Sequence, residues 1–272
     1  MTSQPQGTPS TLADLDRGIS PARFSTFKNA ARGDDDLARR LYVWNRDLSV
    51  AFLADIAILE VALRNAMNDV ATAQWGTHWY SSRDVVLDDR SAGQLNAAWK
   101  YLPTATQRRA SDPDVPGRLI AHCMFGFWTN LLDAGDHAGR EPRKVRANYE
   151  DLWQVFKLAF PGGRIEARAQ RTIIQNTAQQ PTDAATRARL NATVFTRAWV
   201  HGICQNVNVL RNRVAHHEPV INGMPLNGQR QRMSAADAHE QCLLLARIID
   251  RRLGTWLESN TSVPTLLSNR PT

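Results

Sequence analysis

Apolar residues recur every three or four positions along most of this chain, and no segment alternates apolar and polar residues convincingly. The clearest stripe predicts one very long helix that begins at Asp34 to Asp36 and runs to about Ala73. At ~1.5 Å per residue such a helix would be about 55 Å long, which suits the spine of a bundle. Its apolar positions are Leu41, Trp44, Leu48, Phe52, Leu59, Leu63, Met67 and Val70. We therefore predict an all-α fold.

A second long helix is expected in the C-terminal half of the chain. Asp183 is a good N-cap for it, and Pro219 stops it after it has reached toward Ala215. A proline-punctuated loop is predicted at 103–117, and a loop or hairpin-like excursion at 222–229. Shorter helices are predicted at 20–31, 91–101, 118–134, 143–160, 164–178 and 234–257. Two long core helices with additional short ones are typical of a helical bundle.

The organisation along the chain is simple. No internal repeat is visible, so we predict a single all-helical domain over residues 20–258. The polar segment 1–19 is expected to be disordered, and the segment 259–272 is expected to form a flexible tail.

The composition is that of an ordinary globular protein. Of the 272 residues, 43% are hydrophobic and 22% are charged. No uninterrupted apolar stretch approaches the roughly 18 residues that a membrane span requires. The N-terminus lacks both the basic start and the apolar run of a secretory signal. We therefore expect a cytoplasmic protein with no membrane partner.

The net charge is positive, and arginine supplies most of it. The formal charge is +7, with 29 arginines against 4 lysines. The planar guanidinium fork suits phosphate oxygens, so the charge is compatible with a nucleic-acid partner. A GC-rich genome would also replace lysine with arginine without functional meaning. The charge alone leaves the question open.

Neither the cysteines nor the histidines show the spacing of a metal site. Cys123, Cys204 and Cys242 are far apart and lie in apolar helical contexts, where they are expected to act as small buried hydrophobes. His216 and His217 are adjacent and would point ~100° apart on a helix. There is no HExxH pattern to recruit a further ligand such as His239. We expect no metal and no cofactor.

The segment 209–220, VLRNRVAHHEPV, concentrates the polar chemistry of the chain at a helix end. Asn212 and His216 are four residues apart and therefore share a helix face. Arg211 and His216 are five apart, which places them ~140° apart on a straight helix. Both reach one phosphate only if the last turn unwinds before Pro219 or if they flank a shared cleft. An apolar stripe would fix this helix to the core: Ile203, Val207, Leu210 and Val214.

These residue types suit the cleavage of RNA by its own 2′-hydroxyl. Histidine titrates near neutral pH and can move the protons, while arginine can stabilise the extra charge on a pentavalent phosphorus. No metal ligand is required for this reaction. Residue types alone would nevertheless match many surface helices.

Segment 209–220 resembles the RN-x-x-x-H motif of the HEPN superfamily, many of whose members are metal-independent endoribonucleases. More specifically, the chain resembles the Abi-like (abortive-infection) branch of that superfamily. The resemblance extends from about residue 20 to residue 220. The matching segments are SPARFSTF (20–27) with LYVWN (41–45), LEVALRNAM (59–67), FGFW (125–128) and RNRVAHHEP (211–219).

The resemblance implies roles for the residues of the motif. Arg211 would stabilise the phosphate, and His216 would be the general acid or base. Asn212 would orient a partner or bind RNA. Arg213, His217 and Glu218 would support the site or bind substrate.

The resemblance also implies partners. HEPN enzymes commonly build one cleft from two facing copies of the motif. Since this chain has one copy, a homodimer with a composite site is expected. The substrate would be RNA, with tRNA as one candidate, and an RNA or protein antitoxin would restrain a toxin of the phage-defence type.

Three polar residues interrupt the otherwise apolar window 57–67, and two interpretations of them remain open. Glu60 and Arg64 are four apart and can form a structural pair, as buried ionisable groups usually do. Alternatively, Glu60, Arg64 and Asn65 lie beneath the Arg211–His216 cleft and support it.

Two aromatic groups could bind bases. Phe125, Phe127 and Trp128 are at helical spacing and are expected to be core, with Gly126 allowing a close helix approach. A loop contains Trp75, Trp79 and Tyr80, which are the better candidates for exposed stacking.

The alternative function is a catalytically silent HEPN module that binds RNA or a partner protein. The presence of both Arg211 and His216 argues against it.

Overall fold

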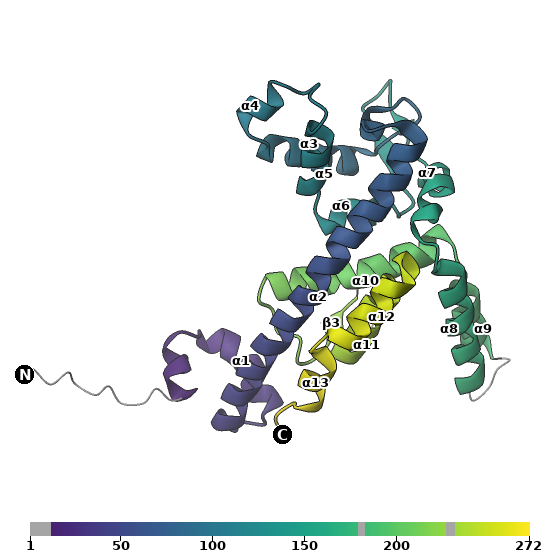
Figure 1. The fold of residues 1–272 in the computed structure, drawn as a ribbon. Coiled ribbons are helices and arrows are strands. Elements are labelled where there is room, and N and C mark those ends of the chain that lie inside the picture. The colour runs from purple at the N-terminus through teal and green to yellow at the C-terminus, as the bar shows by residue number, and fades with distance from the viewer. Residues whose placement is uncertain (1–11, 179–182, 227–231) are drawn as a thin grey trace, which may run out of the picture. The chain divides into compact units, whose positions relative to one another are not determined.

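The computed structural model describes residues 12–178, 183–226 and 232–272, and it is all-α (Figure 1). Within these ranges the only strands are two short antiparallel hairpins. The strand β1 (His137–Ala138) pairs with β2 (Val145–Arg146), and β3 (Met224–Pro225) pairs with β4 (Arg232–Met233). None of the described helices combines the length and the apolar character that crossing a bilayer demands.

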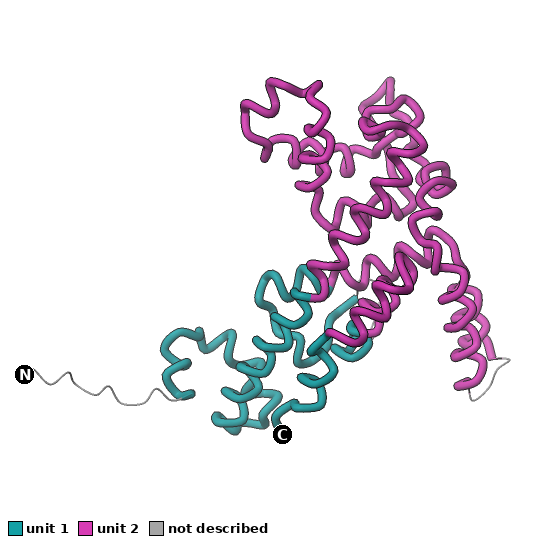
Figure 2. Tube along the Cα trace, viewed as in Figure 1, with its two compact units in different colours: residues 1–54, 210–239, 261–272 teal, residues 55–209, 240–260 magenta. Residues whose placement is uncertain are grey.

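The chain divides into two compact units, where the sequence predicts one domain (Figure 2). Unit 1 comprises residues 1–54, 210–239 and 261–272, and unit 2 comprises residues 55–209 and 240–260. Three long helices contribute residues to both units: α2 (Asp35–Trp75), α10 (Arg197–Ala215) and α11 (Ala235–Ile249). Unit 1 also contains η1 (Leu12–Arg17), α1 (Pro21–Ala30), α13 (Val263–Ser268) and the β3–β4 hairpin.

Unit 2 contains the remaining elements. They are η2 (Trp79–Ser81), α3 (Asp89–Tyr101), α4 (Thr104–Gln107), α5 (Val115–His122), α6 (Phe125–Asn130), the β1–β2 hairpin, α7 (Tyr149–Phe156), η3 (Lys157–Ala159), α8 (Gly163–Thr177), α9 (Ala184–Ala192) and α12 (Arg251–Asn260).

The long helix α2 confirms the strongest prediction from the pattern. It has 41 residues, and the side chain of Asp34 accepts a hydrogen bond from Leu37 N–H at 2.9 Å at its start. Every predicted stripe residue from Leu41 to Met67 is buried, and Val70 is half-buried. The short helix α1 likewise begins where expected, because the Ser20 side chain accepts from Arg23 N–H at 3.3 Å.

The second predicted long helix is wrong as a single element. Asp183 does cap a helix, since its carboxylate accepts from Thr186 N–H at 2.5 Å, but that helix is α9 and ends at Ala192. The Thr193 hydroxyl bonds back to the Arg189 carbonyl at 2.8 Å, and α10 begins only at Arg197. Phe195 lies in this break, and its ring leaves no room for a Cβ on Gly163.

Several shorter predictions need correction. The loop predicted at 103–117 contains α4, and the helix predicted at 118–134 is divided into α5 and α6. The helix predicted at 143–160 begins only with α7, because β2 occupies residues 145–146. The hairpin-like excursion is confirmed as β3–β4, although residues 227–231 lie outside the described residues.

The two ends of the chain also differ from expectation. The final helix is broken at Asp250 into α11 and α12. The segment 259–272 contains α13, where the sequence predicts only a tail, and Trp44 Nε1 donates to the Leu266 carbonyl at 2.6 Å. Residues 12–17 of the N-terminal segment form η1, and residues 1–11 lie outside the described residues.

Candidate active site

The motif identified in the sequence lies in unit 1, where α10 ends and the chain reverses. Glu218 N–H donates to the Arg213 carbonyl at 2.8 Å, and His217 N–H donates to the Val214 carbonyl at 3.1 Å. These two bonds form a Schellman motif, in which His217 occupies the left-handed position with φ 57°. Glycine usually takes that position, because a side chain there costs about 1 kcal/mol or more. Arg32, with φ 53°, is the other non-glycine residue of the described chain that adopts this conformation.

The side chain of Arg213 holds this turn through two contacts with the residues that follow it. Its side chain is 19% exposed; Nε donates to the Pro219 carbonyl at 2.8 Å, and Nη1 lies 3.3 Å from the Glu218 carboxylate. The ion pair takes the place of the apolar contact that often accompanies a Schellman motif. Burial lowers the pKa of the Arg213 guanidinium, and the positive charge of Arg232 lowers it further. The negative charge of Glu218 opposes this shift. Arg213 and Glu218 thus hold the reversal of the chain.

The residues predicted to be catalytic lie on the same turn. His216 is exposed, and its backbone N–H donates to the Asn212 carbonyl at 3.0 Å. Asn212 is exposed as well, and its carboxamide oxygen accepts from Arg211 Nη1 at 3.3 Å. Arg211 is half-buried. Since α10 ends at Ala215, His216 is the first residue past the helix, and its N–H still makes the last helical i→i−4 bond.

Arg23 is a site residue that sequence reasoning did not single out. Its guanidinium, from the first turn of α1, donates to the His217 carbonyl. This contact ties α1 to the motif turn. The only sequence signal was its place within SPARFSTF, immediately after the Ser20–Pro21 start of α1.

Glu60, Arg64 and Asn65 belong to unit 2, where Glu60 and Arg64 have partners. The Glu60 carboxylate accepts from Phe125 N–H at 2.9 Å, and Arg64 Nη1 donates to the Ala121 carbonyl at 2.7 Å. Asn65 is exposed. Glu60 and Arg64 therefore hold the connection between α5 and α6, which gives them a structural task.

The predicted aromatic core is confirmed, but the predicted close approach at Gly126 and the predicted exposure of Trp79 are wrong. Phe125, Phe127 and Trp128 are at most 1% exposed and belong to the core. A Cβ on Gly126 would meet only ordinary side-chain contacts at 3.8 Å, so no close helix approach depends on that glycine. Trp79 is fully buried against Trp128, and its Nε1 donates to Asn68 at 3.0 Å, so it is no exposed stacking platform.

The cysteines are buried, as the sequence predicts. Burial raises the pKa of the Cys123 thiol to about 12 and raises the pKa of Cys204 and Cys242 further. Among the described residues, no group of three or more His, Cys, Asp and Glu side chains could hold a metal ion.

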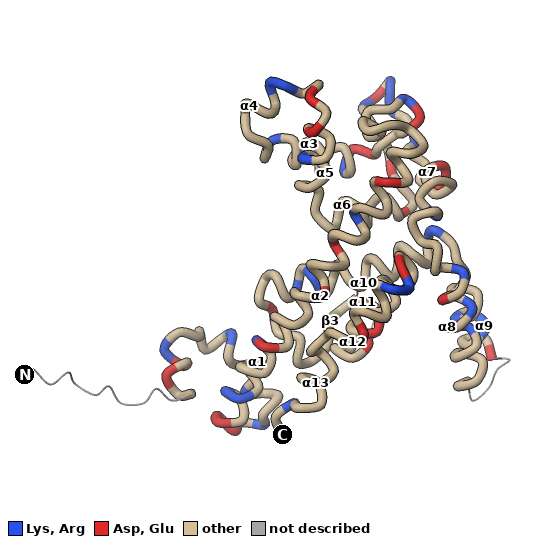
Figure 3. Tube along the Cα trace, in the orientation of Figure 1, with Lys and Arg blue, Asp and Glu red and all other residues tan. Residues whose placement is uncertain are grey.

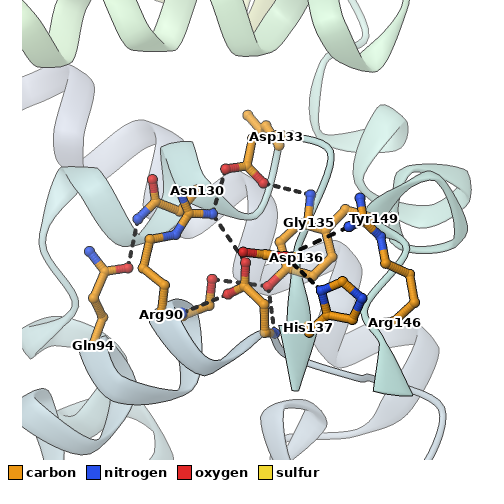
Figure 4. A network of polar contacts seen from close by, with 12 residues as sticks. Arg90, Gln94, Asn130, Asp133, Gly135, Asp136, His137, Arg146 and Tyr149 are labelled. Carbon is orange, nitrogen blue, oxygen red and sulfur yellow. Dashed lines mark hydrogen bonds and ion pairs between the residues drawn. The ribbon is translucent and has the colours of Figure 1, made fainter. Parts of the chain in front are cut away.

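A second polar cluster lies in unit 2, around a cavity of about 700 Å³ beside the β1–β2 hairpin (Figure 4). Arg90 pairs with Asp88 at 3.2 Å and with Asp133. Asp133 accepts from Gly135 N–H at 2.7 Å, and Asp89 accepts from Gly139 N–H at 2.9 Å. These acidic groups are engaged in fixing the α6–β1 connection and the hairpin to the start of α3, so we assign the cluster a structural role.

Asp88 gives this cluster a predicted dependence on pH. Burial alone would raise the pKa of Asp88, but hydrogen bonds from Ser91 and Tyr149 together with the charge of Arg90 hold it below its ordinary value of 3.8. A carboxyl group whose pKa is depressed by folding stabilises the protein above pH 3.8 and loses that contribution as the pH falls through its native pKa.

We therefore expect Asp88→Asn, which keeps an N-cap oxygen, to lower the free energy of unfolding at pH 6. The difference from the unmodified protein should shrink steadily as the pH falls from 5 toward 2. Urea unfolding across that range measures it, and exposed Asp84→Asn is the matched control. A difference that is independent of pH would contradict the linkage.

Searches with family models, among curated proteins and among solved structures each found no match to this chain. The assignment of function therefore depends on the residues and geometry described above.

Proposed function

We propose that this chain is a metal-independent endoribonuclease of the HEPN type that acts on cytoplasmic RNA. The observation that carries the proposal is the turn at the end of α10, where an exposed imidazole follows an arginine–asparagine pair by one helical turn. The arrangement supplies a proton-transfer group and a fixed cation within six residues, 211–216.

The reaction follows from these two groups. His216 accepts the proton of the ribose 2′-hydroxyl or returns one to the departing 5′-oxygen. The 2′-oxygen attacks the adjacent phosphorus, the bond to the 5′-oxygen breaks, and Arg211 stabilises the added negative charge in between. The products are a 2′,3′-cyclic phosphate and a 5′-hydroxyl end. Asn212 orients the Arg211 guanidinium through its carboxamide oxygen.

Arginines lie along α8 and α9 (Figure 3), and the exposed ones among them support a nucleic-acid substrate. The acidic residues of this helix pair are engaged: Glu166 pairs with Arg247 at 3.1 Å, and Asp183 caps α9. The exposed cations are Arg164, Arg168, Arg187 and Arg189. Cations along a helix pair attract a phosphate backbone whatever its base sequence.

The experiment that tests the proposal is cleavage of bulk RNA by the purified chain in excess EDTA. We expect cleavage at an unchanged rate, with products that end in 2′,3′-cyclic phosphate, because the site uses histidine and arginine alone. Phosphatase treatment with and without acid opening of the ring identifies the ends. Loss of cleavage in EDTA and its return with magnesium would refute the mechanism, and absence of any cleavage would favour the silent binding module.

The proposal includes a homodimer, because one chain supplies one copy of the motif. Isologous pairing about a two-fold axis is the commonest symmetry of soluble oligomers. Such pairing would bring two copies of Arg211 and His216 to one phosphate. It would also gather part of the +7 charge of each chain where the RNA backbone passes.

The dimer predicts complementation between two inactive chains. A His216→Ala chain mixed with an Arg211→Ala chain, after dissociation and reassociation, should recover a measurable fraction of activity. Each mixed dimer retains one intact arginine and one intact histidine in its shared cleft. Different affinity tags isolate the mixed species. Activity no greater than that of either variant alone, in a verified mixed dimer, would refute a shared site, as would full activity in a monomer.

A further inference from the structure

A cavity of about 220 Å³ lies in unit 1 against the motif turn. Its walls come from α1, from the first half of α2 and from the end of α10. Val214 and His217 contribute the α10 side, so the cavity shares the turn that carries His216. The other lining residues are Arg23, Phe27, Tyr42, Asn45, Arg46, Ser49, Val50 and Leu53.

Part of the wall is aromatic and apolar. Phe27 is 1% exposed, and its ring meets the half-buried ring of Tyr42 edge to face, with centroids 5.1 Å apart. Val214, which also lines the cavity, is fully buried. A planar, weakly polar group can pack against such a wall, as unstacked bases do against aromatic side chains.

One polar group in this wall has a free donor. Asn45 is only 7% exposed, and its Oδ1 accepts from Val220 N–H at 2.9 Å. This bond fixes the orientation of the carboxamide. In the described part of the chain Nδ2 has no hydrogen-bond acceptor, although Asn45 lines the cavity. The Nδ2 group of Asn45 is therefore available to a ligand in the cavity that offers an oxygen or a ring nitrogen as acceptor.

The charges around the cavity are positive. Arg23 and Arg46 are exposed at its lining, and no carboxylate belongs to the lining among the described residues. Arg46 pairs with neighbouring Asp47 at 2.7 Å, while both side chains remain solvent-accessible. A ligand that carries a phosphate is therefore favoured over a neutral or cationic one.

We propose that this cavity binds one unpaired base of the RNA, next to the phosphate on which Arg211 and His216 act. The inference rests on the proposed function and names its specificity. We assign the Nδ2 donor of Asn45 to O4 of uracil, a position at which cytosine carries an amino group that cannot accept a hydrogen bond. Because His217 lines the cavity and follows His216 directly, a bound base fixes the scissile phosphate at the motif.

The decisive variant is Asn45→Asp, which keeps an oxygen for Val220 N–H and replaces the NH2 donor by an acceptor. Cleavage of the dinucleotides UpA and CpA by the dimeric protein is compared, because uracil and cytosine differ by O4 against N4–H2. We expect the unmodified chain to prefer UpA by about tenfold, the effect of one hydrogen bond lost and one group left unpaired. Asn45→Asp should abolish this preference for UpA or reverse it in favour of CpA.

Two further variants test whether the base preference comes from the Asn45 donor rather than from ring packing or from the added negative charge. Tyr42→Leu should weaken cleavage of both dinucleotides and leave their ratio unchanged, because it removes the ring and keeps Asn45. Asn29→Asp adds the same charge at an exposed position of α1 and should change neither rate. A thermal melt checks that each variant is folded. A UpA:CpA ratio that is the same in the unmodified chain and in Asn45→Asp would overturn the proposal.

Binding separates this inference from the proposed catalysis. Titration of His216→Ala with uridine 3′-monophosphate and cytidine 3′-monophosphate measures base preference without turnover. Preference for the uridine nucleotide that Asn45→Asp removes would support the cavity even if no RNA were cut, in which case only the nuclease proposal fails. RNA cleavage with no base preference would overturn the cavity and leave the nuclease. Displacement of the nucleotide as protein concentration rises would assign the cavity to a second copy and overturn the proposal.

Discussion

Replacing His216 or Arg211 with alanine is expected to lower RNA cleavage by about 100-fold or more. For His216→Ala the free energy of unfolding should change by less than about 0.5 kcal/mol. His216 is exposed, and the bond that places it in the turn runs from its backbone N–H to Asn212, which alanine keeps. The measurements are initial rates on a defined RNA and urea unfolding of the same preparations.

Matched controls come from unit 2. His78→Ala and Arg108→Ala remove one exposed imidazole and one exposed guanidinium that do not belong to the motif, and both variants should leave cleavage unchanged. A toxin would also slow growth when expressed, and either motif variant should relieve that effect. Folded variants that cleave RNA as fast as the unmodified chain would remove Arg211 and His216 from the mechanism.

The parts of the fold that could be predicted are those decided by local pattern. The stripe of α2 and the caps at Ser20 and Asp34 each depend on residues within a few positions of one another. The break between α9 and α10 does not: it depends on Phe195 packing against Gly163, some thirty residues away in sequence. Likewise, Trp79 follows a helix end and suggests an exposed loop, but unit 2 folds around it.

The candidate site shows the same division. The motif 211–218 could be found because its chemistry is contiguous in sequence. The contacts of Arg213 with the Pro219 carbonyl and the Glu218 carboxylate, which we call the Arg213 brace, could not be predicted. Nor could the contact from Arg23, since all of them depend on the path of the chain after Ala215. Asn45 had a readable signal, a polar residue next to Trp44 in an apolar stripe. Only the structure shows that Oδ1 is taken by Val220 and that Nδ2 is left for the cavity.

The brace leads to the second large expected effect. Arg213→Met keeps the apolar stem but removes the bonds to the Pro219 carbonyl and the Glu218 carboxylate. We expect it to lower the free energy of unfolding by about 2 kcal/mol, the scale of charge-assisted hydrogen bonds at a mostly buried site. Because His216 then loses its fixed position, kcat should fall by on the order of 100-fold. Arg213→Lys retains the positive charge but lacks the guanidinium fork. Its stability and kcat should lie between those of the unmodified chain and those of Arg213→Met.

The same measurements distinguish a brace from a phosphate contact. If Arg213 bound RNA directly, Arg213→Met would raise KM, reduce the salt dependence of binding and leave stability unchanged. Glu218→Gln provides the complementary test, since it weakens the ion pair and leaves every cation in place. A brace predicts lower stability and lower kcat for that variant, whereas a phosphate contact predicts tighter RNA binding. His217→Gly should raise stability, because glycine adopts φ 57° without strain. If Arg213→Met, Arg213→Lys and Glu218→Gln all kept full stability and kcat, the turn would not depend on Arg213.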